Sequence, residues 1–591
     1  MIAPPNMIIF SLKICFKAGL KSAIWQIIVA LLRGIEPVVS IYLVAKFISS
    51  VAEIIQNKNN ELFEAFQWLL LAALVVLLMR AVDAVSALVS LRYRENLQSS
   101  IEKQLIEKIY SLNQEQFDRT DFNVILSKAI NSKDSINDIF DKTILLFSSL
   151  ITFVVSILSI SAYSPLVSLI IVVTIVPSLI FELYNNKRFD AVETENDKDW
   201  RIMSRTGWLL LDPSRMPEIR ILGAYKKLFD VWHIRKKLIF SREMKIQILS
   251  QKYSIIGNFI RIIGDILSNI WLLKLVVFGN FGLDNFLFLR GLLIEASSNI
   301  GTLVANTQGI HKNYIEIRNL CSVLFQKNSI SDGTKKIGSE NINIYFDNVS
   351  FKYPGEDTFA IKNLTFSVNY GQKIAIVGEN GSGKSTIMKL LLRQYLPSTG
   401  KIYINGLDII DLKLDDYYEK MSVIMQDSNI FEHLTVDENI RFGVGRSVDR
   451  TEVIRAAKQS GAHNFIEKLR YGYDHRLMNT FDDGTQLSGG ESQRICLARF
   501  FARTSSFFVV DEPTSAVDAE GEEQIFSHIF SAKKNKTAIV ISHRFNTVRR
   551  ADKIFVLRKG ILEESGNHES LMKNDSIYRR MFLTQAAGYI E

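Results

Sequence analysis

The feature that most constrains this chain is a run of 39 residues, 143–181, without Asp, Glu, Lys, Arg or His. As one continuous helix it would measure about 58 Å, whereas the hydrocarbon core of a bilayer is about 30 Å thick. We therefore interpret the run as two membrane spans. Pro165 lies near its middle and disfavours helix at the residue before it, so a very short hairpin turn is expected at residues 163–165.

Six spans are expected in all, because four more apolar segments occur, at about 24–55, 65–91, 253–278 and 286–304. An even number of spans leaves both ends of this part of the chain on one side of the membrane. The positive-inside rule makes that side the cytoplasm, since basic residues flank the first two spans: Lys13, Lys17, Lys21, Arg92, Arg94, Lys103 and Lys108. Residues 7–18 resemble an amphipathic helix at the interface, with a signal peptide as the competing interpretation.

The distribution of charge argues against a nucleic-acid partner. Lys and Arg number 70 against 62 Asp and Glu, a net charge of +8. Residues 341–591 contain 32 basic and 32 acidic residues, so the whole surplus lies in the first 340 residues, with the apolar segments. A basic excess in that position is typical of the flanks of membrane spans rather than of a phosphate-binding surface. Three widely spaced cysteines, Cys15, Cys321 and Cys496, indicate neither a disulfide framework nor a metal cluster.

Two polar stretches between spans, 92–142 and 182–252, are too long for simple connections. If their helices continue from the spans, they extend tens of Å into the cytoplasm, where a soluble domain is expected to dock on their tips. Charged residues inside the spans form pairs at helical spacing: Arg33 with Glu36, Arg80 with Asp83, and Arg261 with Asp265. One explanation is that each pair neutralises itself on one helix face. The other is a water-filled cavity, also lined by Lys274, Arg290 and Glu295, that favours a polar or zwitterionic cargo.

After a polar linker at about 328–340 the pattern changes, so a membrane domain is expected at 1–327 and a second domain, of short strands and soluble helices, at 341–591. In the second domain a strand, 373–377, leads into a glycine-rich loop and then an apolar helix, the order that a P-loop requires. The loop consists of Gly378, Glu379, Asn380, Gly381, Ser382, Gly383, Lys384, Ser385 and Thr386. Its N–H groups are expected to bind the phosphates of ATP, Lys384 the β and γ oxygens, and Ser385 a Mg²⁺ ion.

A second apolar strand, 507–510, ends in two carboxylates, Asp511 and Glu512. Asp511 is expected near the Mg²⁺, and Glu512 is predicted to be the general base that polarises the attacking water. An isolated Asp-Glu pair would ordinarily be a solvated turn. Here the preceding strand and the P-loop fit one nucleotide-binding fold.

Between these motifs lies 487–494 (LSGGESQR), and with it the sequence resembles the ATP-binding cassette (ABC) family. Ser488, Gly489 and Gly490 resemble the family signature, with Glu491 where Gln is commonest. The resemblance implies that Tyr353 stacks on adenine, that Gln426 senses Mg²⁺, that Asp518 belongs to the D-loop, and that His543 contacts the γ-phosphate. Gln426 and His543 therefore join Glu512 as predicted catalytic residues. The ordered motifs cover about residues 345–570.

The family also implies a dimer in which Ser488 and Gly490 of one protomer cap the nucleotide on the partner's P-loop. A homodimer would have two competent sites, with a heterodimer as the alternative. Six spans ahead of one cassette resemble an exporter half-transporter: an all-α six-helix transmembrane domain of the type IV exporter fold, followed by an α/β P-loop NTPase domain. Residues 116–125 and 211–221 correspond to the coupling helices. Asn479 departs from the family's usual Glu, so Asp482 or Asp483 is expected to make the contacts between domains instead.

The sequence thus predicts an ATP-hydrolysing translocase of a bacterial cytoplasmic (inner) membrane, with its nucleotide-binding domain in the cytoplasm. Its expected cargo is an amphipathic peptide or peptide-derived natural product, moved outward by alternating access. A lipid flippase or multidrug exporter is the alternative. A soluble ABC ATPase is excluded by the uncharged run at 143–181, and intact Glu512 and His543 argue against a channel that ATP merely gates.

Overall fold

The computed structural model describes residues 7–57, 62–132, 135–278, 281–326, 332–426, 429–444, 448–479, 481–511, 519–531, 536–542, 548–573 and 575–587. The chain forms two compact units. The first, called here the helical unit, is Met1–Tyr110 with Thr120–Lys327, and the second, the cassette unit, is Ser111–Arg119 with Asn328–Glu591. The finer division predicted from sequence, a linker at 328–340 and a domain from 341, stays a prediction.

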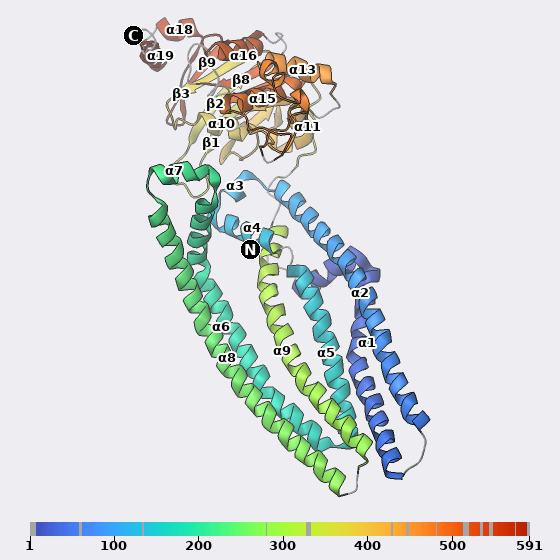
Figure 1. Ribbon diagram of the computed structural model, residues 1–591. Helices are drawn as coiled ribbons and strands as arrows, with labels where there is room; N and C mark the ends of the chain where they lie inside the picture. Colours follow the sequence, from blue (N-terminus) through green and yellow to red (C-terminus); the bar gives the residue numbers. More distant parts are fainter. Residues whose placement is uncertain are drawn as a thin grey trace. The chain divides into compact units, whose positions relative to one another are not determined.

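Six long helices make up most of the described helical unit: α1 Met7–Asn57, α2 Leu62–Tyr110, α5 Ser135–Tyr163, α6 Pro165–Leu211, α8 Tyr225–Val277 and α9 Leu283–Leu324. Figure 1 shows α6 and α8 running side by side, while α1 packs along α2 and α5 along α9. Shorter elements join them: α4 Thr120–Asn131, the 3₁₀ turn η1 Pro213–Arg215 and α7 Met216–Ile221.

Two local expectations are confirmed by the helix boundaries. The uncharged run is divided at Ser164, where α5 ends and α6 begins with Pro165 at its first turn. Proline is favoured there because its missing N–H needs no partner in the first turn. In α1 the backbone leaves the helical conformation at Gly19, which separates the predicted amphipathic segment 7–18 from the rest of the helix.

The helical unit exposes apolar side chains as a membrane protein does. Leu70, Leu77 and Leu88 on α2 are each more than half exposed, whereas a soluble surface rarely carries continuous apolar patches. By length and composition, four described stretches are apolar enough to cross a membrane: Gly19–Ile55, Leu62–Tyr110, Ser135–Tyr163 and Leu283–Leu324. The remaining long helices, α6 and α8, combine an apolar part with long polar extensions.

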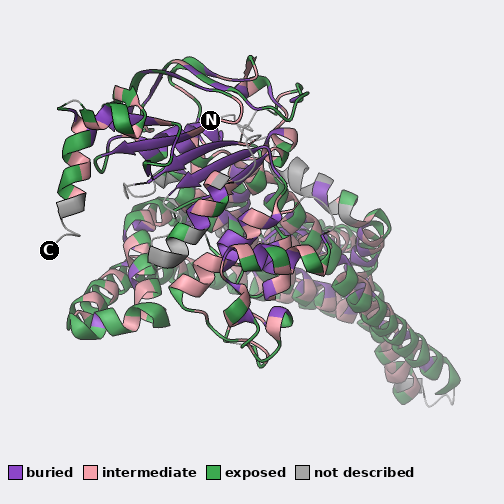
Figure 2. Cartoon of the chain, turned by 90° about the horizontal axis from the view of Figure 1, so that it is seen from above, coloured by how far each residue is buried: buried purple, intermediate pink, exposed green. Residues whose placement is uncertain are grey.

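The cassette unit contains two sheets. Strands β1 Ile344–Phe351, β2 Ile361–Val368, β4 Thr399–Ile404 and β5 Leu407–Asp408 form an antiparallel sheet in the order β2-β1-β4-β5. The second has the order β10-β9-β3-β8-β7-β6 and is parallel except for β10. Its strands are β3 Lys373–Gly378, β6 Met421–Ile424, β7 Phe507–Asp511, β8 Thr537–Ile541, β9 Lys553–Arg558 and β10 Ile561–Gly566. The strands of the parallel sheet are mostly purple in Figure 2, because helices and the other sheet bury them.

Helices cover the parallel sheet, as expected where parallel strands are joined by crossovers, and some of the described helices form a cluster with a buried core of its own. The described ones are α10 Lys384–Leu391, α11 Leu414–Glu419, α12 Val436–Arg441, α13 Arg450–Gln459, α14 His463–Ile466, α15 Gly489–Ala502, α16 Ala519–Ser531, α18 His568–Lys573 and α19 Ile577–Ala587. The cassette unit also includes α3, Gln114–Phe117, although the chain on both sides of it belongs to the helical unit. The predicted stretch 116–125 is therefore divided between the two units.

Candidate functional site

The sheet register places three of the predicted motifs at one edge. Asp511, the last residue of β7, is paired with Ile541 at the end of β8, and Ile541 is paired with Ile376 of β3. The carboxyl ends of these parallel strands therefore lie together, with the P-loop following β3 and Ser542 following β8. Gln426 belongs to the same edge because it comes two residues after β6, which runs parallel to β7. In parallel sheets this edge is where ligands bind.

The glycines of the P-loop are required by its backbone. Gly383 caps α10 with a left-handed φ of 103°, and a Cβ there would lie 2.8 Å from the Ala360 carbonyl oxygen. A Cβ on Gly378 would lie 2.3 Å from the carbonyl oxygen of Leu557 on the neighbouring strand β9. Gly381 also has a left-handed φ, 77°. Because Gly378 and Gly383 have no room for a side chain and Gly383 and Gly381 adopt conformations that L-residues avoid, the loop can curl its N–H groups inward.

Two polar groups in the P-loop fit a phosphate. The Lys384 ammonium is buried and donates to the carbonyl oxygens of Gly378 at 2.7 Å and Glu379 at 2.9 Å, so it lies over the loop. The Ser382 hydroxyl is 3% exposed and has no hydrogen-bond partner among the described atoms. A buried hydroxyl without a partner is costly. Both groups lie where the α10 dipole also favours an anion, so these residues fit the phosphates of ATP.

Tyr353 lies just beyond the end of β1 and beside α10. Its hydroxyl forms a 3.0 Å hydrogen bond with the hydroxyl of Thr386, the last residue of the P-loop motif. The ammonium of Lys389 lies 5.2 Å from the centre of its ring, a cation–π contact. The predicted adenine-stacking residue is thus adjacent to the predicted phosphate loop, although its role stays a prediction.

Only some of the residues predicted to bind Mg²⁺ or to catalyse hydrolysis lie within the described part of the chain. Asp511 is buried at the end of β7 and Ser385 is exposed in the first turn of α10. Carboxylate and hydroxyl oxygens are ligands that suit Mg²⁺, so these two fit the predicted metal site. Glu512, Asp518 and His543 lie outside the described residues, and their predicted roles stay predictions.

The signature residues form the start of helix α15, and the structure explains the unusual Glu491. Ser488 is the N-cap of α15, and its hydroxyl accepts a 3.3 Å hydrogen bond from the Glu491 N–H. The Glu491 carboxylate in return accepts from the Ser488 N–H at 2.9 Å and from its hydroxyl at 2.8 Å. This reciprocal capping box works with either Glu or Gln at the third helical position. Gly489 and Gly490 form the first turn that follows.

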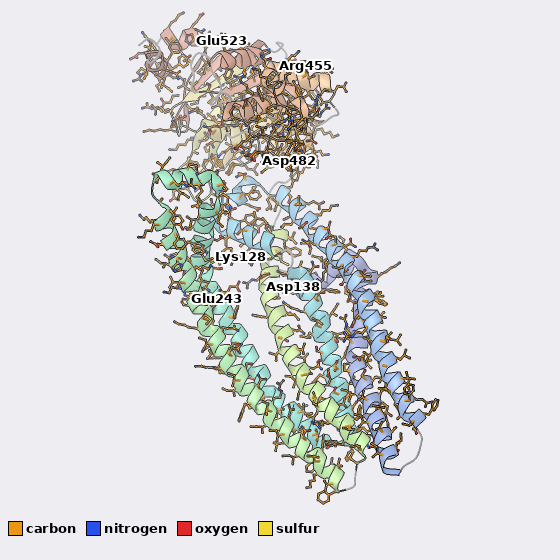
Figure 3. The ribbon with its side chains drawn as sticks, in the orientation of Figure 1. Lys128, Asp138, Glu243, Arg455, Asp482 and Glu523 are labelled. Atoms are coloured by element: carbon orange, nitrogen blue, oxygen red, sulfur yellow. The ribbon has the colours of Figure 1, made fainter. Side chains whose placement is uncertain are left out.

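The loop around Asn479 distinguishes the two acidic residues predicted to replace the usual Glu. Asp483 is engaged within the loop. The Arg476 guanidinium lies 3.6 Å from its carboxylate, and the Arg476 backbone N–H donates to its carbonyl oxygen at 3.3 Å. Asp482, labelled in Figure 3, is exposed, and no contact of its side chain is found among the described residues. Asp482 is therefore the carboxylate of the two that is accessible for a further contact.

The charges in the membrane spans are not paired as their spacing suggested. Arg33 of α1 pairs with Asp83 of the neighbouring helix α2, at 2.8 Å between Nε and Oδ1. The predicted pairing within each helix, Arg33 with Glu36 and Arg80 with Asp83, is therefore wrong for Arg33 and Asp83. The packing of α1 against α2 brings these two opposite charges together instead. Arg261 donates to the Ser297 carbonyl oxygen at 2.7 Å, and the Ser297 hydroxyl donates to Asp265 at 2.6 Å, so Ser297 of α9 bridges Arg261 and Asp265.

Arg261 also lines a polar hollow of about 320 Å³ between α6, α8 and α9. Amides and hydroxyls provide most of its polar lining, from Asn185, Gln247, Ser250, Gln251, Ser254 and Asn258. Lys274 does not line it; its ammonium lies 5.2 Å from the centre of the Trp271 ring. The predicted polar cavity therefore has a counterpart around Arg261, whereas Lys274, Arg290 and Glu295 are not part of this hollow.

A second hollow, of about 410 Å³, lies in the polar extensions, between α4, α6, α8 and α9. Lys128 of α4 and Glu243 of α8 line it and are labelled in Figure 3. Lys128 forms a 2.5 Å ion pair with Asp197 of α6. Sequence patterns did not identify this hollow, because its residues come from four helices that are distant in the chain.

Comparison with known proteins assigns the cassette unit. A family profile described as ABC transporter matches residues 361–515, which include the P-loop, the signature and Asp511. A solved structure titled "Structure of a bacterial Atm1-family ABC exporter with ATP bound" superposes with a TM-score of 0.84 at 22% identity, covering 96% of this chain and 99% of that one. The chain carries an ABC transporter domain and has the fold of an ABC exporter half-transporter. It combines the helical membrane unit and the α/β ABC domain that the sequence predicted, and its cassette is an ABC ATPase domain.

Curated relatives of this half-transporter differ in their described cargo. The "Subtilin transport ATP-binding protein SpaT" of Bacillus subtilis is 28% identical over 563 residues, 93% of this chain and 90% of that protein. An "ATP-dependent lipid A-core flippase" of Haemophilus influenzae is 38% identical over 257 residues, 44% of this chain and 43% of the flippase. The chain thus spans about half the length of such flippases or less, and nearly all of SpaT.

Proposed function

We propose that this half-transporter is an ATP-driven exporter of an amphipathic peptide or peptide-derived natural product across a bacterial cytoplasmic membrane. The observation that carries the cargo assignment is the alignment with the subtilin transport protein, which extends over 93% of this chain and so includes the membrane helices. Cassettes share motifs whatever their cargo, whereas cargo is selected in the membrane unit. Similarity across the membrane unit is therefore the more informative kind.

The polar hollow around Arg261 supports a peptide cargo. Its amides and hydroxyls offer donors and acceptors that suit a peptide backbone, and Arg261 adds a cation that suits a carboxylate. A charged residue inside a membrane unit is costly unless it is paired or hydrated, so its retention at a polar hollow favours a role in the transport path. A purely apolar cargo would require none of these groups.

In the cassette, the proposed roles follow from the residues at the sheet edge. Lys384 and the P-loop N–H groups hold the phosphates of ATP, the Ser382 hydroxyl gains its missing partner, and Tyr353 holds the adenine. Ser385 and Asp511 would hold Mg²⁺, which neutralises developing charge on the phosphates when it is bound. Glu512 then withdraws a proton from the attacking water, and His543 donates to the γ-phosphate, while Gln426 reports on the occupied site.

Two copies of the chain are proposed to act together. Ser488 and Gly490 of one protomer close over the nucleotide on the P-loop of its partner, and the chain carries every residue that two such sites require, so a homodimer is sufficient. Closure of the cassettes is transmitted to the membrane helices through the short helices α3 and α7 and switches the cargo path from inward to outward access. Hydrolysis resets the dimer.

A lipid flippase or multidrug exporter is the second candidate. The observation that favours it is the 38% identity with a lipid A-core flippase, which is higher than the identity with the subtilin transporter. That alignment covers less than half of either protein, so it bears less on the cargo.

The two candidates are distinguished by transport into proteoliposomes. The full chain is reconstituted, ATP is supplied outside to the exposed cassettes, and uptake of fluorescent subtilin is compared with flipping of a fluorescent lipid. The peptide proposal predicts ATP-dependent peptide uptake that Arg261→Gln reduces, while Arg290→Gln, outside the hollow, leaves it at the wild-type level. ATP-dependent lipid flipping without peptide uptake would replace the peptide proposal with the flippase.

A further inference from the structure

Three aromatic rings gather beside the P-loop helix of the cassette unit. Tyr395 packs edge-to-face on Tyr353, with the ring centres 5.4 Å apart and an angle of 84° between the rings. Phe351, at the end of β1, contacts both tyrosines at 5.0 and 5.4 Å. The Lys389 ammonium lies 5.2 Å from the centre of the Tyr353 ring and 5.8 Å from that of Tyr395. Edge-to-face pairs and cation–π contacts are directional, so the plane of the Tyr353 ring depends on where Tyr395 lies.

Tyr395 is itself fixed by a further contact, through its hydroxyl. It is 3% exposed, and its hydroxyl donates a hydrogen bond to the Asp118 carboxylate. Burial and the neighbouring Asp118 both raise the pKa of Tyr395, so the hydroxyl keeps its proton and remains a donor. Hydrogen bonds to a charged acceptor are stronger than neutral ones, and Asp118 is therefore the group that orients this ring.

Asp118 lies in a short segment of the cassette unit that is flanked in the chain by the helical unit. Asp118 is the C-cap of α3, and its N–H donates to the Gln114 carbonyl oxygen. Residues 111–119 belong to the cassette unit, yet the chain before and after them belongs to the helical unit. The α3 segment is therefore connected to Tyr353 by two side-chain contacts in sequence, Asp118 to Tyr395 and Tyr395 to Tyr353.

We propose that Tyr395 is a positioning residue of the ATP site, and that Asp118 of α3, through Tyr395, sets the orientation in which Tyr353 meets adenine. The proposal rests on the proposed adenine-stacking role of Tyr353. Neither Tyr395 nor Asp118 belongs to the P-loop, so their effect is expected on recognition of the base and not of the phosphates.

The test uses the full chain in nanodiscs and compares two ligands, ATP and inorganic tripolyphosphate, by competition with a fluorescent nucleotide. Tripolyphosphate binds the P-loop but has no base, so damage to the P-loop weakens both ligands and a misplaced Tyr353 weakens ATP alone. The reference variant Tyr353→Ala should weaken ATP about fivefold or more, because stacking on an aromatic ring contributes substantially per base. It should leave tripolyphosphate within about twofold of wild type.

Two conservative variants address the proposal. Tyr395→Phe keeps the ring and removes the hydroxyl, and Asp118→Ala removes the acceptor. Each should weaken ATP about threefold or more without weakening tripolyphosphate, and the double variant should be no weaker than the single variants because both delete the same bond. Tyr418→Phe is the matched control. It removes a similar hydroxyl, which donates to the Leu392 carbonyl oxygen at 2.8 Å just beyond the same helix, and it should leave both affinities at the wild-type level.

The outcomes separate the proposal from its premise. If Tyr353→Ala leaves ATP affinity unchanged, the adenine-stacking role is wrong and this proposal falls with it. If Tyr353→Ala weakens ATP but Tyr395→Phe and Asp118→Ala do not, or weaken tripolyphosphate equally, then Tyr353 has its role and the positioning role of Tyr395 is wrong.

Discussion

At the scale of single residues, the cassette combines strictly constrained backbone positions with polar side chains that fit an anion. Gly378 and Gly383 are fixed by neighbouring carbonyl groups that leave no room for a Cβ. Among the described atoms the buried Ser382 hydroxyl has no hydrogen-bond partner, and the Lys384 ammonium donates to the backbone oxygens of Gly378 and Glu379. Such a loop fits an anion, so we expect its residues to contribute to binding, whereas the chemistry is the role proposed for Glu512.

Replacing Glu512 with Gln tests this separation of roles. Because a positioned general base contributes roughly 10²–10⁴-fold, steady-state ATP turnover in Glu512→Gln should fall by about that factor while ATP affinity is retained. Phosphate release from the reconstituted protein measures the turnover, and competition with a fluorescent nucleotide measures the affinity. Turnover within about twofold of wild type would show that another group is the base.

A histidine far from the site makes cassette stability depend on pH. His568 is half-buried, its Nδ1 lies 2.8 Å from the Tyr578 hydroxyl, and its ring packs on Phe582. Burial lowers the pKa of His568 below its usual value of 6.5. Between the folded and the unfolded pKa of this histidine, the unfolded chain binds more protons than the folded one. The contribution of His568 to the free energy of unfolding is therefore fully present above the unfolded pKa and is lost as the pH falls through the folded pKa.

The expected result is a fall in the unfolding temperature of the wild type between about pH 7.5 and pH 5.5 that is larger than in His568→Gln. Scanning fluorimetry of the purified protein measures it. His528→Gln, which replaces an exposed histidine of α16, is the control and should retain the wild-type pH response. An equal pH response in all three proteins would remove His568 as the cause.

At the scale of elements, the long polar extensions of α6 and α8 are joined by a buried carboxylate. Asp199 of α6 is 7% exposed and accepts from Arg235 and Arg242 of α8, each at 2.7 Å. The hydrogen bond from Arg242, followed by that from Arg235, lowers the pKa of Asp199. A carboxylate between two guanidinium groups holds α6 and α8 together in their polar extensions, outside the apolar parts of the two helices. We infer that this cluster makes the two extensions one rigid arm.

The variant Asp199→Asn keeps the shape of the side chain but removes the charge shared by both arginines. Backbone amides near residues 195–200 and 235–242 should then exchange with deuterium several-fold faster, because local opening becomes easier. Asp230→Asn, an exposed position on α8, is the matched control and should leave exchange unchanged. Exchange at the wild-type rate in Asp199→Asn would mean that apolar contacts alone hold the arm together.

At the scale of the whole molecule, the sequence predicted what depends on local pattern and missed what depends on packing. The hairpin at Ser164 follows from bilayer thickness and Pro165, and the P-loop follows from a strand and glycines in order. The pairing of Arg33 with Asp83 could not be predicted from the sequence. A partner at helical spacing and a partner on the next helix compete for the same charge, and the packing of the helices decides which one forms the ion pair. The contacts of Asp118 and Asp199 were hidden for the same reason, since their partners lie 277 and 36 to 43 residues away.

The last prediction concerns how two copies form the ATP sites. If the signature of one protomer completes the P-loop site of its partner, Lys384→Ala and Ser488→Ala each disable both sites of a homodimer. In a mixed dimer of the two variants, one site carries both defects and the other carries neither. Coexpression of the two variants should therefore restore ATP turnover, to about a quarter of the wild type if subunits mix at random and sites act independently. As the control for mixing, two wild-type chains that carry different tags are coexpressed and purified on both tags in turn. If each chain instead built its site alone, every site would carry one defect and coexpression would restore nothing, and the shared arrangement proposed for Ser488 and Gly490 would have to be abandoned.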